Sequence, residues 1–216
     1  MPRKKERPKF IHKASTQEYL HCLQNMSNWS HILLSQNNGK TYNDFLKWIL
    51  KNDYFKTSEN LTIAHISKQS GYSSAKVSKW LQEIYEGILE LNENSPRLFC
   101  AEPGIRVRLQ LRYYDSYCFF SLTLPVIPRV YESFEFFFIK AKIGWDRFWV
   151  KNVEYEIDNN KNTICVFLEG GILNRYREFA VEKALFKGQI SHRDEYEKFD
   201  FEIDDLILGR NRELYG

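Results

Sequence analysis

The sequence predicts an α+β protein, in which an all-helical N-terminal half is followed by a mostly antiparallel sheet with one or two covering helices. Three observations predict this class. Apolar residues recur every three or four positions as far as residue 91, whereas after residue 104 they alternate with polar residues in several short runs. Of the 216 residues, 43% are apolar and 16% aromatic, enough for a sizeable core. The strand-like runs are also separated by short gaps, which favour antiparallel pairing over long crossovers.

Residues 1–14 are expected to form a basic, flexible arm. This segment holds six Lys or Arg residues, and only Glu6 opposes them. Pro2 and Pro8 disfavour a helix there. The charge of the arm suggests a polyanionic partner, but a tail that contacts nothing would have the same composition.

Helices are expected over residues 15–58. Ser15 and Glu18 have the spacing of a capping box, which starts the first helix. The QNNGK stretch at 36–40 interrupts the pattern, and Thr41 with Asp44 then starts another helix. The apolar positions of this second helix are Tyr42, Phe45, Leu46, Ile49 and Leu50. We assign these helices and the next two to one helical domain, residues 15–96.

Residues 61–84 predict two short helices joined by a tight turn. Ile63 and Ile66 lie on the inner face of the first helix, and Ser67 is small enough for a second helix to cross over it. Gly71 supplies the positive φ that the turn needs, and Ser73 is a favourable N-cap. The second helix has one apolar face at three- and four-residue spacing, formed by Val77, Trp80, Leu81 and Ile84. Ser70 departs from the pattern, since an apolar residue usually stands there, and predicts looser packing.

The opposite face of the second helix carries hydroxyls, cations and an amide, which suit phosphate oxygens and base edges. No acidic residue lies between Glu59 and Glu83. This stretch resembles the helix-turn-helix superfamily of transcription regulators, over about 24 of the 216 residues. In the usual docking, residues near the start of the second helix reach the bases. The expected DNA-contacting residues are Ser73, Ser74, Ala75, Lys76, Ser78, Lys79 and Gln82.

The resemblance implies double-stranded DNA as a partner, often bound by a homodimer. The charge distribution agrees, because residues 1–100 hold 14 Lys or Arg against 9 Asp or Glu, whereas residues 101–216 hold 17 against 19. In this setting the N-terminal arm could follow phosphates or enter a minor groove. Its candidate phosphate contacts are Arg3, Lys4, Lys5 and Arg7. The other interpretation of residues 61–84 is an ordinary αα-hairpin in a helical core, with Gly71 as a C-cap.

A winged helix would continue with a β-hairpin. Residues 97–101 and 105–112, around the turn at Glu102, Pro103 and Gly104, could supply one. In IRVRLQLR the apolar residues alternate with Arg106, Arg108, Gln110 and Arg112. If this strand belongs to a wing, Arg106 and Arg108 would contact phosphates. If it belongs to a second domain, the same residues form a solvated sheet face.

The rest of the chain, residues 97–216, is expected to be a single α+β domain. The predicted strands are 116–124, 134–143, 147–157 and 163–170, with a hairpin loop at 158–162. A helix over 173–188 would end at Gly188. It would cover the sheet with Tyr176, Phe179, Ala180, Ala184 and Leu185. The acidic tail from 195 to 216 would add an edge strand, or a short helix that pairs with another chain.

No catalytic, metal or cofactor site is expected. The chain has no GxSxG, P-loop, HExxH or GxGxxG motif, and its four cysteines are scattered. Asp200, Glu202, Asp204 and Asp205 are spaced as a charged surface, not as a ligand set. No apolar run approaches the length of about 18 residues that spans a bilayer. The basic start also lacks the apolar segment of a signal peptide. We therefore expect a non-enzymatic, cytoplasmic protein with reduced thiols and no membrane partner.

These observations favour a sequence-specific DNA-binding protein, namely a transcription regulator. Its C-terminal domain would dimerise, sense a ligand or recruit a partner. A plasmid or transposon replication or mobility factor, which binds DNA through the same motif as an assembly platform, is the first alternative. A protein-interaction module whose αα-hairpin only resembles the motif is the second.

Overall fold

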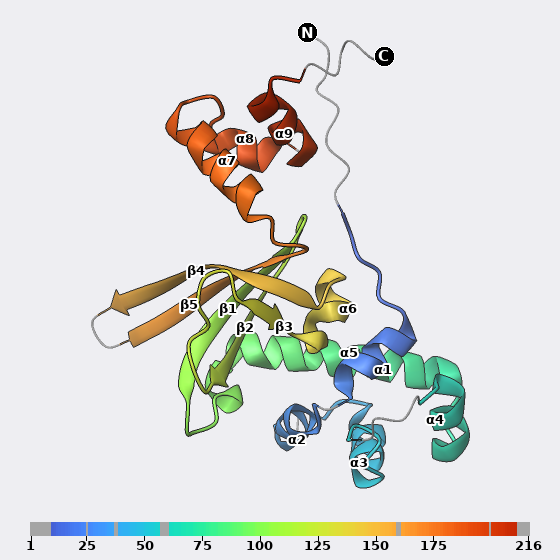
Figure 1. Ribbon diagram of the computed structural model, residues 1–216. Helices are drawn as coiled ribbons and strands as arrows, with labels where there is room; N and C mark the ends of the chain where they lie inside the picture. The colour runs from blue at the N-terminus through green and yellow to red at the C-terminus, as the bar shows by residue number, and fades with distance from the viewer. Residues whose placement is uncertain are drawn as a thin grey trace. The chain divides into compact units, whose positions relative to one another are not determined.

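The computed structural model describes residues 10–24, 26–36, 39–56, 61–158, 161–198 and 200–210. It confirms the α+β class, with helices α1–α5 preceding a five-stranded sheet and further helices at the C-terminal end (Figure 1). The chain divides into two compact units, residues 1–171 and 172–216. Most of the predicted N-terminal arm, residues 1–9, lies outside the described residues, and with it Arg3, Lys4, Lys5 and Arg7.

Five helices open unit 1. They are α1 (Thr16–Leu23), α2 (Ser27–Ser35), α3 (Asn43–Lys51), α4 (Ile63–Ser70) and α5 (Ser74–Asn94). Half of the predicted capping box is confirmed, since the Ser15 hydroxyl accepts a hydrogen bond of 3.2 Å from the Glu18 backbone N–H, while the Glu18 carboxylate contacts His12. The predicted cap at Thr41 is wrong, because α3 begins two residues later and Tyr42 gives it no side-chain cap.

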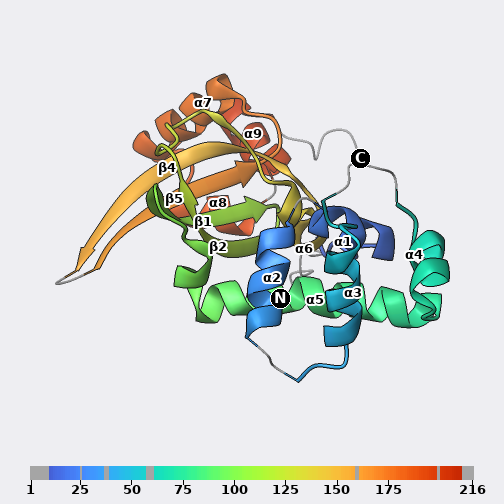
Figure 2. The same ribbon diagram turned by 90° about the horizontal axis from the view of Figure 1, so that it is seen from below.

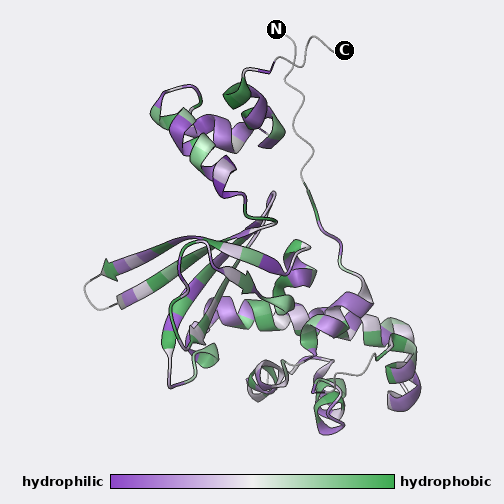
Figure 3. Ribbon diagram, viewed as in Figure 1, coloured by the Kyte–Doolittle hydropathy of each residue, from purple (hydrophilic) through white to green (hydrophobic). Residues whose placement is uncertain are grey.

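The sheet of unit 1 is mixed, with the strand order β2-β1-β5-β4-β3. Its strands are β1 (Ile105–Tyr113), β2 (Ser116–Leu124), β3 (Ser133–Glu135), β4 (Arg147–Asp158) and β5 (Lys161–Gly170). The central β1–β5 pair is parallel and the other pairs are antiparallel. Hydrophilic and hydrophobic bands alternate along the long strands (Figure 3). This alternation buries one face of the sheet and leaves the other exposed.

The predicted strand 134–143 is wrong over most of its length. Only its first two residues lie in β3, and a 3₁₀ helix η2 (Phe137–Ile139) and a helix α6 (Lys140–Ile143) follow. A short apolar run does not by itself distinguish a strand from a buried helix. Here Phe138 and Ile139 are fully buried, and Gly144 ends the turn with a φ of +81°.

The first strand predicted for the wing, residues 97–101, is also wrong. Residues Pro96–Phe99 form a 3₁₀ helix, η1, with the proline at its start, so residues 97–101 give no strand that could pair with β1. Proline suits the first turn of a helix because its φ is already fixed there. β1 pairs instead with β2 and β5. Arg106 and Arg108 therefore belong to a five-stranded sheet.

Helix α5 joins the helical half of unit 1 to the sheet. Its Tyr85 hydroxyl donates a buried hydrogen bond of 2.9 Å to the Phe138 carbonyl. The Asn92 side chain pairs with the backbone of Ser121 in the edge strand β2, donating to its carbonyl at 2.7 Å and accepting from its N–H at 2.8 Å. The hydrophobic core accordingly runs without interruption from α1 to β5. The predicted domain boundary after residue 96 thus falls inside this unit.

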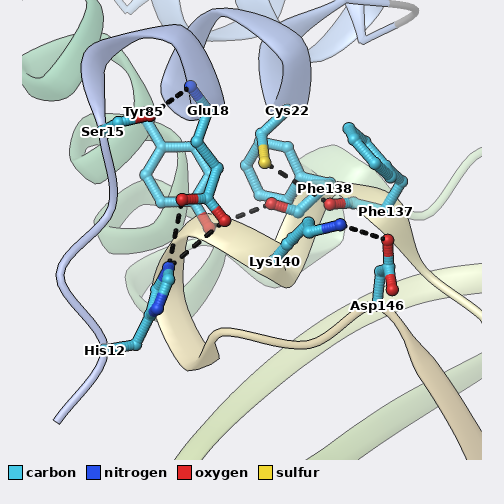
Figure 4. Close-up of polar contacts among 9 residues, drawn as sticks. All are labelled: His12, Ser15, Glu18, Cys22, Tyr85, Phe137, Phe138, Lys140 and Asp146. Carbon is cyan, nitrogen blue, oxygen red and sulfur yellow. Dashed lines mark hydrogen bonds and ion pairs between the residues drawn. The ribbon is translucent and has the colours of Figure 1, made fainter.

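Polar contacts also fasten α1 to the segment after β3 (Figure 4). The Cys22 thiol lies 3.4 Å from the Phe137 carbonyl, to which it donates. Burial raises the pKa of this thiol to about 12, so it stays protonated and keeps its donor. Nearby, His12 lies 3.1 Å from the Glu18 carboxylate, and Lys140 pairs with Asp146 at 3.0 Å. The Cys22–Phe137 hydrogen bond thus joins α1 to η2, whereas the two ion pairs lie within the segment that leads into α1 and within the segment after β3.

Unit 2 is a small helical unit. Its helices are α7 (Arg175–Phe186), α8 (His192–Glu197) and α9 (Asp200–Leu208). The tail is therefore helical and forms no edge strand in residues 200–208. Among its described residues, the buried apolar side chains are Val181, Ala184, Ile190 and Ile203. Asp200 and Asp204 were expected to belong to a charged surface, and both form ion pairs with Arg177, at 3.3 and 2.8 Å.

The predicted face of the first helix of unit 2 is partly wrong. Tyr176 and Phe179 were expected to be covered by the sheet, but they are 90% and 64% exposed. Ala184 is buried, together with Val181, on the side of α7 that packs against α9. The sequence pattern could not distinguish these two sides, because apolar residues occur on both.

We expect the Asn92→Ala variant to be about 2 kcal/mol less stable than the wild type, because two backbone groups of Ser121 lose their partner. Urea denaturation followed by tryptophan fluorescence measures this, and all five tryptophans lie in unit 1. Asn94→Ala, an exposed change on the same helix, is the control. Equal stability of the two variants would contradict the role of Asn92.

Candidate nucleic-acid interface

The chain bends sharply between α4 and α5. Gly71 has a φ of +74°, and its backbone N–H closes α4 by donating to the Ser67 carbonyl at 3.1 Å. Ser73 then begins α5, its hydroxyl accepting a hydrogen bond of 3.4 Å from the Lys76 N–H. The predicted turn at Gly71 and the predicted N-cap at Ser73 are both confirmed. The two helices meet at one end of unit 1 (Figure 2).

Two serines hold the turn in shape. The Ser67 hydroxyl donates a hydrogen bond of 2.6 Å to the Tyr72 carbonyl, across the bend. The Ser70 hydroxyl accepts one of 3.3 Å from the Tyr72 N–H. The hydroxyl of Ser70 therefore has a structural role that the sequence pattern did not predict. It satisfies a backbone donor inside the turn, where a purely apolar side chain would leave that donor without this partner.

An aromatic cluster fixes the pair of helices to α3. The ring centroids of Tyr72 and Trp80 lie 4.8 Å apart, edge to face, and Phe45 packs against both at 6.0 and 5.4 Å. The Trp80 indole N–H also donates to the Thr41 hydroxyl at 3.4 Å. Beneath the aromatic rings, the fully buried side chains are Ile66, Val77, Leu81 and Ile84. The inner face of the motif is thus held by three elements.

The outer face at the start of α5 is free of tertiary cover. Of the predicted contact residues, those that are exposed are Ser73, Ser74, Ala75, Lys76, Lys79 and Gln82, while Ser78 is half-buried. The Lys76 ammonium lies 6.0 Å from the centre of the Trp80 ring, a weak cation–π contact at the end of its long side chain. All seven residues therefore occupy one end of one helix.

The charge of α5 changes sign along its length. Lys79 lies 3.7 Å from Glu83, and the Gln82 amide donates to Glu86 at 2.8 Å. Both partners are one turn further along the helix, where acidic residues begin. The Lys79 side chain is 73% exposed, so this ion pair is weak and a phosphate can replace it. The acidic stretch limits the polyanion-compatible surface of α5 to residues 73–82.

The structure does not bring Arg106 and Arg108 to this surface. They lie on β1, whose partner strand β2 is held by Asn92 near the far end of α5 (Figure 2). Arg106 lies 3.5 Å from Glu102, and the Arg108 guanidinium lies 4.7 Å from the centre of the Phe119 ring. Ser73 and these arginines therefore do not form one continuous phosphate-binding surface, as they would in a winged helix.

The described part of the chain holds no group of three His, Cys, Asp or Glu side chains arranged to bind a metal ion. No helix within that part has the length and apolar character to cross a membrane. The chain matches no protein family model, no curated protein and no solved structure. The function must therefore be argued from the geometry alone.

We expect Gly71→Ala to be about 1 kcal/mol less stable than the wild type. A Cβ atom at Gly71 meets nothing within 4 Å, so the cost comes from the left-handed backbone alone. Thermal denaturation measures this change. The matched control is Gly71→Asn, because asparagine tolerates this conformation, and it should retain most of the stability. If alanine and asparagine are equally tolerated, the bend does not depend on the positive φ.

Proposed function

We propose that the chain binds double-stranded DNA in a sequence-specific manner and acts as a transcription regulator. The observation that carries the proposal is the start of α5, where a cationic, hydroxyl-rich face is exposed and the opposite face is fully buried. The bend at Gly71 ends α4 just before this face begins, so the first turns of α5 stand at the end of the unit. This arrangement fits a helix presented to a major groove.

The side chains divide by the contacts they suit. Ser73, Ser74 and Ala75, at the helix start, are small enough to let the backbone approach the DNA. Lys76 and Lys79 lie one turn apart and can reach phosphates or the acceptor edge of guanine. Gln82 marks the end of the contact surface, since its amide is already bonded to Glu86. Specificity would come from the lysines and hydroxyls, and affinity from phosphate neutralisation.

We further propose that unit 2 forms a homodimer. Successive residues of an α-helix are about 100° apart, which places Tyr176, Phe179 and Phe186 on one stripe of α7. This stripe lies on the opposite side of the helix from Val181 and Ala184. The three aromatic side chains are 90%, 64% and 92% exposed. We call this set the α7 stripe.

The size of the α7 stripe suits a second copy of the chain. An aromatic side chain buries about 150–250 Å², so the stripe offers roughly 500 Å². A standard interface takes about 800 Å² from each partner, and the residues around the stripe on α7 would supply the rest. In the part of unit 2 that the structure describes, four buried apolar side chains make a small core for a helical unit. A self-complementary contact would remove this deficit and join two DNA-binding helices.

We expect Lys76→Ala with Lys79→Ala to weaken duplex binding about tenfold and to lower the slope of log K against log salt by about 2, because two phosphate contacts are lost. Fluorescence anisotropy with duplexes selected from a random pool, at several salt concentrations, measures both. Lys142→Ala with Arg147→Ala is the control, since it removes two exposed cations elsewhere in unit 1. If both double variants bind alike, α5 is not the reading helix.

We expect Phe179→Glu with Phe186→Glu to convert a dimer to a monomer, because two carboxylates would face each other across the contact. Sedimentation velocity measures the mass, and circular dichroism checks that the helices are retained. Gln189→Glu, an exposed change just beyond α7, is the control. A wild-type protein that sediments as a monomer would refute the dimer but would not bear on duplex binding.

A further inference from the structure

We propose that the exposed face of the sheet binds single-stranded DNA. This face, called here the outer face, carries the β1 residues Arg106, Arg108, Gln110 and Arg112 and their cross-strand neighbours. It lies opposite the face that Val107, Leu109 and Leu111 bury. Two adjoining hollows, of about 580 and 380 Å³, lie along it and share Phe119.

Aromatic side chains form the floor of the outer face where the two hollows meet. Tyr117 and Phe119, two residues apart on β2, are 68% and 42% exposed, with ring centroids 6.1 Å apart. Phe167, half-buried on β5, lines the smaller hollow with them. Such exposed rings on a sheet serve as stacking platforms for bases. Bases in a duplex have no free face to stack, which favours a single strand.

A row of cations accompanies the rings. Arg106, Arg108 and Arg112 lie on the same face of β1, and strand geometry spaces neighbours of this kind by about 6.7 Å. Arg108 is held against the Phe119 ring, so its charge stays next to the stacking surface. Around the two hollows, five Lys or Arg residues stand against three Glu residues. The positive excess suits the phosphates of a strand whose bases lie on the rings.

The rim makes the outer face concave. On one side η1 contributes Arg97, and Cys100 follows it directly. On the other side the β4–β5 hairpin contributes Glu156, Asn162 and Thr163. An extended strand fits between these walls along β1, whereas a rigid duplex could touch only their edges. Glu169 on β5 lies 4.0 Å from Arg112 and Glu156 lies on β4, so phosphates are expected over the Arg106 and Arg108 end of β1.

The choice of DNA over RNA rests on the proposed duplex binding by α5, since an opened duplex would supply the strand. Residues of the outer face belong to the same unit as α5 but lie towards its other end. The two surfaces therefore do not share side chains. Together the two surfaces suit a chain that opens the duplex it recognises, a step that goes beyond duplex binding alone.

The test uses the full chain and a fluorescein-labelled 15-mer of thymidylate, with fluorescence anisotropy at several salt concentrations. We expect Tyr117→Ala to weaken binding about tenfold through the loss of one stacked base. Arg108→Gln should lower the salt slope by about 0.7, through the loss of one single-strand phosphate. The control is Tyr155→Ala, because Tyr155 is 62% exposed on the opposite face of the sheet, and it should bind like the wild type.

Three outcomes would overturn the proposal. They are no binding of the 15-mer, equal effects of Tyr117→Ala and Tyr155→Ala, or tighter binding of a uridylate 15-mer of the same length. Lys76→Ala with Lys79→Ala should leave thymidylate binding unchanged, and Tyr117→Ala should leave duplex binding unchanged. Failure of the outer face and failure of the α5 assignment are thereby distinguished.

Discussion

Helix α5 packs against α4 at its start and against the sheet of unit 1 further along, and these two contacts together fix its orientation. The first turns of α5 pack against α4 beyond the bend at Gly71, while Tyr85 and Asn92 further along bond to η2 and to β2. The helix therefore cannot rotate to suit one end without disturbing the other. Gly71 allows this, because its positive φ ends α4 and lets α5 take the direction that the sheet requires.

The distribution of charge along α5 follows from the same constraint. The outward-facing residues between 73 and 82 include no carboxylate, whereas Glu83, Glu86, Glu90 and Glu93 follow in the part that supports the sheet. A polyanion is thus admitted at one end of the helix and repelled along the remainder. The buried face continues through both parts without interruption, with Val77, Leu81, Ile84 and Ile88 in line. The proposed DNA surface therefore differs from the rest of α5 in its exposure and charge, and not in the packing of its buried face.

The sequence predicted the structure correctly wherever the pattern lay within a few neighbouring residues. Gly71 and Ser73 marked the bend, and clean alternation marked β1, β2, β4 and β5 to within a few residues. It failed at 97–101 and 134–143, where proline or an unbroken apolar run allowed more than one structure. The parallel β1–β5 pair joins segments about 55 residues apart, and no local pattern reports such a pairing. The outer face was missed for the same reason, although Tyr117 and Phe119 lie directly opposite Arg112 and Gln110 of β1.

The two proposed nucleic-acid surfaces have consequences for each other because they share a rigid core. Asn92 fixes β2 to α5, so the stacking rings on β2 keep a set position relative to Lys76 and Lys79. A duplex bound at the start of α5 must therefore be deformed before one of its strands can reach the outer face. Regulation needs only the first contact, whereas strand opening needs both. Contact of Tyr117 and Phe119 with a base would therefore add strand opening to the regulatory role proposed for the surface at the start of α5.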